Sequence, residues 1–248
     1  MAEREREIGS EQGRGGGRGA FGARTSTSVP ESRTLRSSSP FAAYRLPAGR
    51  SSIPRELAAE NQRWRMLGAT ALILFEEGYA HTTVAKVAGC AGVSRKTFYE
   101  HFDDLAGCML ATYEMAAGSL LDAVQAACEE AEEGEDPVAV AARRGLEFAA
   151  AEPTLAYLLG VETPVGLPAL AAQWEKLIAK LASLLALAWE TEAQDPSELP
   201  SIGQRAMVGA ALVLVADQIG RDGGDDLDVL EPSLTALLGR ATAPPAIA

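Results

Sequence analysis

The sequence predicts an all-α protein in which a small N-terminal helical unit continues into a larger helical bundle. Successive segments have apolar residues at the spacing of one face of an α-helix, and proline or glycine residues lie between the segments. No stretch alternates apolar and polar residues as a strand does. With 248 residues, 47% of them hydrophobic, the chain is long enough to bury a sizeable core.

Residues 1–50 are rich in Gly, Arg, Ser and Pro and precede the first helical pattern. A segment so poor in apolar residues does not bury enough surface to offset the entropy of ordering, so we expect a disordered tail. Two interpretations of it stay open. It is either a basic arm that touches phosphates or a dispensable leader.

The first helical pattern begins near Ser52, with Pro54 where the first turn of a helix accepts proline. It ends at Gly78, and its expected apolar face comprises Trp64, Leu67, Ala71, Leu74 and Phe75. Two short helices follow at about 83–90 and 94–101, and a long one at about 104–132. Later helices are expected at about 137–150, 153–160, 168–190, 201–220 and 227–240.

The formal net charge of −12 is unevenly distributed along the chain. Residues 1–55 contain ten Arg against five Glu, whereas residues 105–248 contain seven basic residues against twenty-two acidic ones. The N-terminal part of the chain is therefore compatible with binding to phosphate groups, whereas the acidic C-terminal part would repel them.

Residues 82–102 have the pattern of a helix-turn-helix. Two helices that cross steeply through a short turn need a small residue at their closest approach and a glycine in the turn. Ala88 and Gly92 meet these needs, and Val87, Val93 and Phe98 are spaced to close the wedge between the helices.

The second helix of this motif presents the residue types that bind DNA. Arg95 and Lys96 can reach guanine or a phosphate, Thr97 a thymine methyl or a phosphate, and Tyr99 and His101 backbone phosphates. Side-chain oxygens are available to cap both helices. Thr82 or Thr83 can cap the first and Ser94 the second, and a helix N-terminus favours phosphate. The predicted DNA-binding residues are Thr83, Ser94, Arg95, Lys96, Thr97, Tyr99 and His101.

Four short motifs together resemble the DNA-binding domain of tetracycline-repressor-type (TetR family) transcriptional regulators: Gly78-Tyr79, Thr82-Thr83-Val84, Ala91-Gly92-Val93-Ser94 and Thr97-Phe98-Tyr99-Glu100-His101-Phe102. The resemblance covers about residues 55–110. It implies a homodimer whose three-helix N-terminal unit binds double-stranded operator DNA and whose C-terminal helices form a ligand pocket and a dimer interface. The expected organisation is a tail at 1–50, a DNA-binding domain at 51–104 and a ligand-binding and dimerisation domain at 105–242.

One position departs from the family pattern. Where these regulators commonly have a Lys-Glu pair that opens the next helix, this chain has Leu105-Ala106, so a lysine contact with phosphate is missing. Asp103 and Asp104 just before it are candidates to cap that helix, although their charge is unfavourable near DNA.

Other classes of site find little support in the sequence. The two histidines and three cysteines have no metal-ligand spacing, and neither a nucleophile elbow nor a phosphate-binding loop occurs, so we expect no metal, no cofactor and no enzyme. Cys90, Cys108 and Cys128 are expected to be small core residues in a reducing cytoplasm. The apolar run at 206–216 is too short for a membrane span.

The C-terminal helices carry the expectations on ligand and assembly. Aromatic residues among many alanines suggest an apolar pocket for an unknown small-molecule effector, with Tyr113, Phe148, Tyr157 and Trp174 as candidate lining residues. The alternative is a filled core in which these aromatic residues pack against one another. Apolar residues nearly all round segments 201–220 and 227–240 predict burial by a second subunit. A ligand-released repressor is thus the first hypothesis. The alternative is an all-α ligand-binding or enzymatic domain that keeps the helix-turn-helix only as structure.

Overall fold

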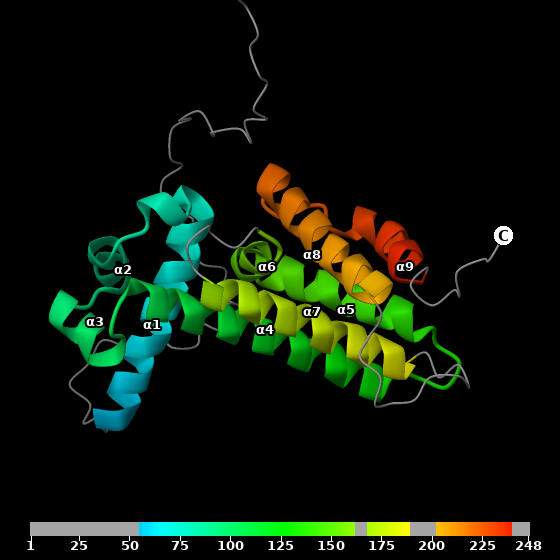
Figure 1. The fold of residues 1–248 in the computed structure, drawn as a ribbon, viewed down its shortest axis with the longest axis horizontal. Helices are drawn as coiled ribbons and strands as arrows, with labels where there is room; N and C mark the ends of the chain where they lie inside the picture. The colour runs from blue at the N-terminus through cyan, green and yellow to red at the C-terminus, as the bar shows by residue number, and fades with distance from the viewer. Residues whose placement is uncertain (1–54, 162–167, 189–201, 240–248) are drawn as a thin grey trace, which may run out of the picture. The chain divides into compact units, whose positions relative to one another are not determined.

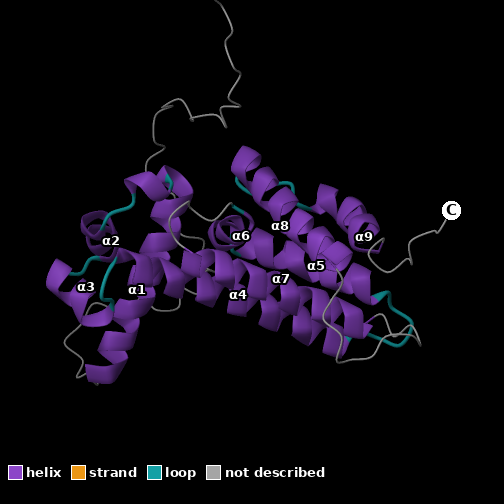
Figure 2. Cartoon of the chain, in the orientation of Figure 1, coloured by secondary structure: helices purple, strands orange, loops and turns teal. Residues whose placement is uncertain are grey.

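Helices account for all the regular secondary structure in the computed structural model, which describes residues 55–161, 168–188 and 202–239. Within these ranges there is no strand (Figure 1, Figure 2). The elements are α1 (Arg55–Glu77), η1 (Tyr79–His81), α2 (Val84–Ala91), α3 (Arg95–His101), α4 (Leu105–Glu130), α5 (Pro137–Ala151), α6 (Pro153–Gly160), α7 (Pro168–Ala188), α8 (Ile202–Asp222), η2 (Asp228–Leu230) and α9 (Glu231–Gly239). The predicted all-α fold is confirmed. The predicted tail at 1–50 lies outside the described residues.

Side-chain caps and prolines fix several helix starts. Asp104 caps α4 by accepting a hydrogen bond from the backbone N–H of Gly107 at 2.7 Å. Asp136 caps α5 by accepting from the backbone N–H of Val138 at 2.9 Å, and Pro137 lies in the first turn of α5. These local signals explain why the sequence pattern located the helix boundaries within a few residues.

Helix α1 buries a wider face than its apolar spacing predicts. Leu67 and Ala71 are buried as expected, and the buried set extends to Met66, Ala69, Thr70 and Ile73. The reason is that α1 contacts α2, α4 and α6 and so meets neighbours on more than one side. A single stripe describes a helix with one partner, which is not the situation of α1.

Helices α6 and α8 make an especially close crossing in the C-terminal bundle. Gly160 at the end of α6 is buried, and a side-chain Cβ at this position would run into the backbone carbonyl of Leu212 and the side chain of Ala216 in α8. Only glycine allows the two backbones to approach this closely.

Helix α8 has one buried face and one exposed apolar face. Val208, Ala216 and Ile219 are buried, whereas Val213 and Leu214 are 48% and 44% exposed. Although its uninterrupted apolar run at 206–216 is too short for a span, α8 as a whole is, among the described helices, long and apolar enough by length and composition alone to cross a bilayer, with a mean hydropathy of 1.2, a test that the core helix of a soluble protein also passes. It therefore offers apolar surface that its own bundle does not cover.

Candidate nucleic-acid interface and ligand cavity

Helices α2 and α3 form a helix-turn-helix whose turn depends on Gly92. This residue has φ 64° and ψ 38°, in the left-handed region that favours glycine. The chain after it is held by a hydrogen bond from the N–H of Val93 to the carbonyl of Ala88 at 2.9 Å. Val87 and Phe98 are buried between the helices, so the predicted turn geometry is confirmed.

Both helices begin with a side-chain cap. Thr83 accepts a hydrogen bond from the N–H of Lys86 at 3.3 Å, and Ser94 accepts one from the N–H of Thr97 at 3.0 Å. Thr82, the alternative cap for α2, is buried instead and donates its hydroxyl to the carbonyl of Gly78 at 2.9 Å. The cap of α2 is therefore Thr83.

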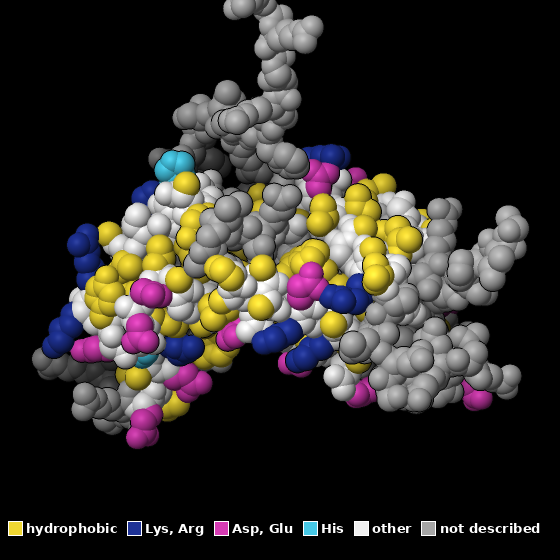
Figure 3. Space-filling view, viewed as in Figure 1, with side chains coloured by type: hydrophobic (Ala, Val, Ile, Leu, Met, Phe, Trp, Pro, Cys, Tyr) yellow, Lys and Arg dark blue, Asp and Glu magenta, His cyan; other side chains and the backbone are white. Residues whose placement is uncertain are grey.

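The outer face of α3 is polar and open. Arg95, Lys96 and Tyr99 are exposed, while Thr97 and His101 are half-buried. In the space-filling view, Lys and Arg side chains occur at the α2–α3 end among acidic and apolar ones, and further Lys and Arg side chains lie over the bundle helices (Figure 3). The seven predicted DNA-binding residues thus come from the two capped helix starts and α3. Their contacts with DNA stay a prediction.

Intramolecular partners already engage some charges of this unit. Lys86 forms an ion pair with Glu77 at the end of α1, and Lys96 lies 3.9 Å from Glu100 one turn along α3. Burial, followed by the nearby charge of Arg63, lowers the pKa of His101 below its ordinary value of 6.5. His101 is therefore mostly neutral at pH 7, and any phosphate contact it makes uses a neutral N–H group.

Two arginines of α1 that the sequence reasoning missed touch this motif. Arg65 donates to the carbonyl of Gly92 in the turn at 3.4 Å. Arg63 donates to the carbonyl of His101 at 3.5 Å and lies 4.6 Å from the centre of the Phe102 ring. The only signal in the sequence was that two arginines stand in the helix that precedes the motif.

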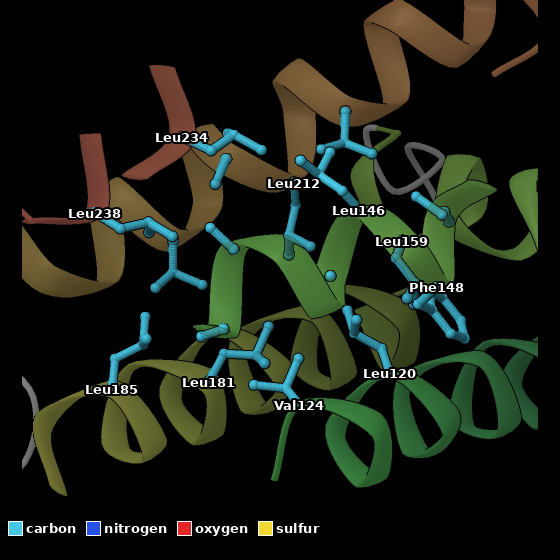
Figure 4. A pocket seen from close by; sticks show the side chains of 18 residues that line it. Leu120, Val124, Leu146, Phe148, Leu159, Leu181, Leu185, Leu212, Leu234 and Leu238 are labelled. Carbon is cyan, nitrogen blue, oxygen red and sulfur yellow. The ribbon is translucent and has the colours of Figure 1, made fainter. Parts of the chain in front are cut away.

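A cavity between the helices of the C-terminal bundle is lined only by apolar residues. The cavity has a volume of about 80 Å³ for the centres of water-sized spheres, several times the space that one water molecule needs. Side chains from α4 to α9 surround it (Figure 4), including Leu120, Leu146, Leu159, Leu181, Leu212 and Leu234. The lining contains no ionisable group and no side-chain hydrogen-bonding group.

The four aromatic candidates for the ligand pocket lie in different places. Phe148 lines the cavity. Tyr157 is outside its lining and packs edge to face on Phe75, while Trp174 lies beside Gly209 of α8. Tyr113, also outside the lining, is buried, and its hydroxyl finds no hydrogen-bond partner in the described part of the chain. Leucine, valine and alanine predominate in the lining, and their composition alone does not separate them from ordinary core residues.

The cysteines differ from the expectation at one position. Cys108 is buried with its Sγ 3.2 Å from the hydroxyl of Thr70, and Cys128 is half-buried. Cys90 is exposed, so the prediction that all three are core residues is wrong for it. The buried residues of α2 are Val87, Ala88 and Ala91, and Cys90 falls on the other side of this short helix. Among the described residues no group of three His, Cys, Asp or Glu side chains is arranged to hold a metal ion.

Comparisons with known proteins agree with this geometry. Residues 67–112 match the family model "Bacterial regulatory proteins, tetR family". The fold is similar to that of the fatty acid degradation regulator FadR from Bacillus halodurans, at 20% identity, 71% coverage of this chain, 94% coverage of that chain and a TM-score of 0.60. It is also similar to FadR from Bacillus subtilis in complex with stearoyl-CoA, at 18% identity, 70% and 96% coverage and a TM-score of 0.58. No curated protein matches the chain significantly.

Proposed function

We propose that the protein, whose residues 67–112 match the family model of tetR-type bacterial regulatory proteins, is a homodimeric repressor that a small apolar molecule releases from operator DNA. This function needs no catalytic step, and the protein would act in the cytoplasm, where the bacterial chromosome lies.

The observation that carries the proposal is the exposed face of α3 beside two capped helix starts. Arg95, Lys96 and Tyr99 extend from a short helix that Phe98 anchors in the core. A helix held in this way fits the major groove, where arginine and lysine read guanine edges and free N–H groups at helix starts meet phosphates. The alternative hypothesis, in which the motif is only structural, does not explain why this exposed face is basic.

The exposed apolar face of α8 supports the homodimer. Val213 and Leu214 stand open on this helix, and α9 packs beside it. Two copies that pair through α8 and α9 would bury this surface in a four-helix bundle. Such a two-fold dimer brings two copies of α3 about one DNA turn apart, roughly 34 to 36 Å or somewhat more.

The cavity supports an apolar effector. Its lining offers dispersion contacts and no polar partner, so a hydrocarbon portion of a ligand is the part that fits it. The Bacillus subtilis protein with a similar fold was solved with stearoyl-CoA, a molecule with a long hydrocarbon chain. To act as an inducer, the ligand must bind the DNA-incompetent state more tightly than the competent one. A coupling of about 1 to 3 kcal/mol would weaken operator binding about 5- to 150-fold.

The first experiment tests DNA binding. The full-length protein selects duplexes from a random pool, and the selected site is titrated with wild type, Arg95→Ala and the matched control Arg144→Ala on α5. Arg95→Ala should cost about 1 to 3 kcal/mol and relax specificity at one base pair in each half-site, while the control binds like wild type. If no duplex is enriched, or if Arg95→Ala binds like wild type, the assignment is wrong.

The second experiment tests assembly and release. Sedimentation at micromolar concentration should give a dimer, and Val213→Glu together with Leu214→Glu should shift it towards monomer. Aliphatic ligands that raise the melting temperature should also lower operator affinity. A monomeric wild type contradicts the dimer, and stabilising ligands that leave DNA affinity unchanged contradict the switch.

A further inference from the structure

The junction between α3 and α4 lacks a basic residue of its own. From Thr97 to Ala142 the sequence contains no lysine or arginine, and the junction itself contains Asp103, Asp104 and the half-buried Leu105. His101, at the end of α3, is mostly neutral at pH 7 because burial and Arg63 lower its pKa. A phosphate at this end of α3 would therefore meet two carboxylates and need a cation from another element.

Arg63 of α1 is the cation that the fold brings to this junction. Its guanidinium donates to the carbonyl of His101 at 3.5 Å and lies 4.6 Å from the centre of the Phe102 ring. The side chain is exposed, so the group can meet a partner from solvent. Contacts with residues at the end of α3 therefore hold the Arg63 guanidinium in place, in addition to the position of Arg63 on α1.

The guanidinium also keeps hydrogen-bonding capacity. In the described part of the chain no carboxylate lies within ion-pair distance of Arg63, in contrast to Lys86 and Lys96 with Glu77 and Glu100. An arginine has five N–H donors, and the contact with His101 uses one of them. Arginine is suited to phosphate because this planar fork binds two oxygens at once.

The spacing along α3 fits a backbone contact beside a base contact. The two ends of the seven-residue α3 are about 10 Å apart, which is the length of about three nucleotide steps along one DNA strand. Arg95 lies at the start of α3, and the guanidinium of Arg63 contacts its end. We propose that Arg63 binds a DNA backbone phosphate at the α3–α4 junction. It supplies there the positive charge that residues 97–142, which contain no lysine or arginine, do not supply. This inference rests on the proposed DNA-binding function.

The test uses the salt dependence of binding to the duplex that the wild type selects. Arg63→Gln removes the charge and keeps an N–H donor for the carbonyl of His101, and Arg63→Met removes the charge and keeps an apolar stem over Phe102. Because each subunit of either variant neutralises one phosphate fewer, the slope of log K against log salt should become shallower by about 1.8. The affinity ratio of wild type to variant should then shrink about 12-fold between about 50 and 200 mM salt. Arg63→Lys keeps the charge and should retain the wild-type slope.

Controls separate this role from a structural one. Arg144→Gln removes a charge from α5, where the arginine pairs with Glu147 at 2.9 Å, and should leave the slope unchanged. Melting temperatures of all variants show whether the fold is intact. If either folded charge-removing variant keeps the wild-type slope, Arg63 only stabilises the motif and the inference is wrong. If the wild type itself binds no duplex, it is the proposed function that fails.

Discussion

The ring of Phe75 in α1 meets the ring of Tyr157 in α6 edge to face, with 4.9 Å between centroids and 85° between planes. Helix α1 supports the helix-turn-helix, whereas Ala156 and Leu159 of α6 line the cavity. This aromatic pair is thus a direct contact between the helix that supports the helix-turn-helix and a helix of the cavity wall.

The first prediction measures this contact. Phe75→Leu, Tyr157→Leu and the double variant form a mutant cycle in urea unfolding, and the coupling should be about 0.5 to 1.5 kcal/mol because edge-to-face rings interact beyond their buried area. Additive single effects would mean that the two rings only fill space.

The second prediction concerns Gly92. Gly92→Ala should destabilise the protein by about 1 to 2 kcal/mol, since the left-handed conformation crowds a Cβ and the new atom meets the guanidinium of Arg65. Gly89→Ala is the matched control inside α2, where a Cβ meets nothing within 4 Å. It should stabilise by about 0.5 to 1 kcal/mol. Equal effects in chemical denaturation would contradict the turn geometry.

The third prediction concerns the crossing of α6 and α8. Gly160→Ala should cost about 1 to 3 kcal/mol or more, because a backbone carbonyl cannot move aside as a flexible side chain does. Gly118→Ala in α4, with open space around its Cβ, should be neutral or stabilising in the same thermal melts. A tolerated Gly160→Ala would show that the helices cross farther apart.

The fourth prediction concerns the hydroxyl of Tyr113. A buried hydroxyl without a partner costs free energy, so Tyr113→Phe should leave the unfolding free energy equal or raise it by about 1 kcal/mol. The same variant tests the predicted ligand role of Tyr113. If the hydroxyl meets an effector, Tyr113→Phe lowers the ligand-induced shift in melting temperature while the unliganded protein stays stable. A loss of stability without ligand would reveal a partner for the hydroxyl.

The fifth prediction is an alkaline loss of stability from Cys108. Burial raises the pKa of this thiol from 9.0 to about 11, so above pH 9 the unfolded chain releases a proton that the native chain keeps. Stability is therefore complete well below pH 9 and decreases as pH rises towards 11, by about 1.4 kcal/mol at pH 10. Unfolding free energies between about pH 8 and 10 should show this decrease in wild type and in Cys90→Ala, and a smaller one in Cys108→Ala. An identical decrease in Cys108→Ala would assign it to other groups.

Local signals made the fold and the helix-turn-helix predictable from sequence. Ser94, Asp104 and Gly92 act within a few residues of themselves, so their capping and turn roles follow from spacing alone. The contacts of Arg63 and Arg65 reach 38 and 27 residues along the chain, and no local pattern encodes them. The exposure of Cys90 and the separation of Tyr157 and Trp174 from the cavity depend likewise on how the helices pack.

The purely apolar cavity has a consequence for selectivity. If the cavity binds the proposed effector, a lining without a hydrogen-bonding side chain would select molecules by length and width and not by functional group. Each extra or missing methylene is worth about 1 to 3 kcal/mol in such a site, and an added hydroxyl is rejected only weakly. A homologous series of chain lengths would therefore give a graded response with one optimum. Under the proposed function, the protein would therefore report the abundance of a class of hydrophobic compounds and not of a single metabolite.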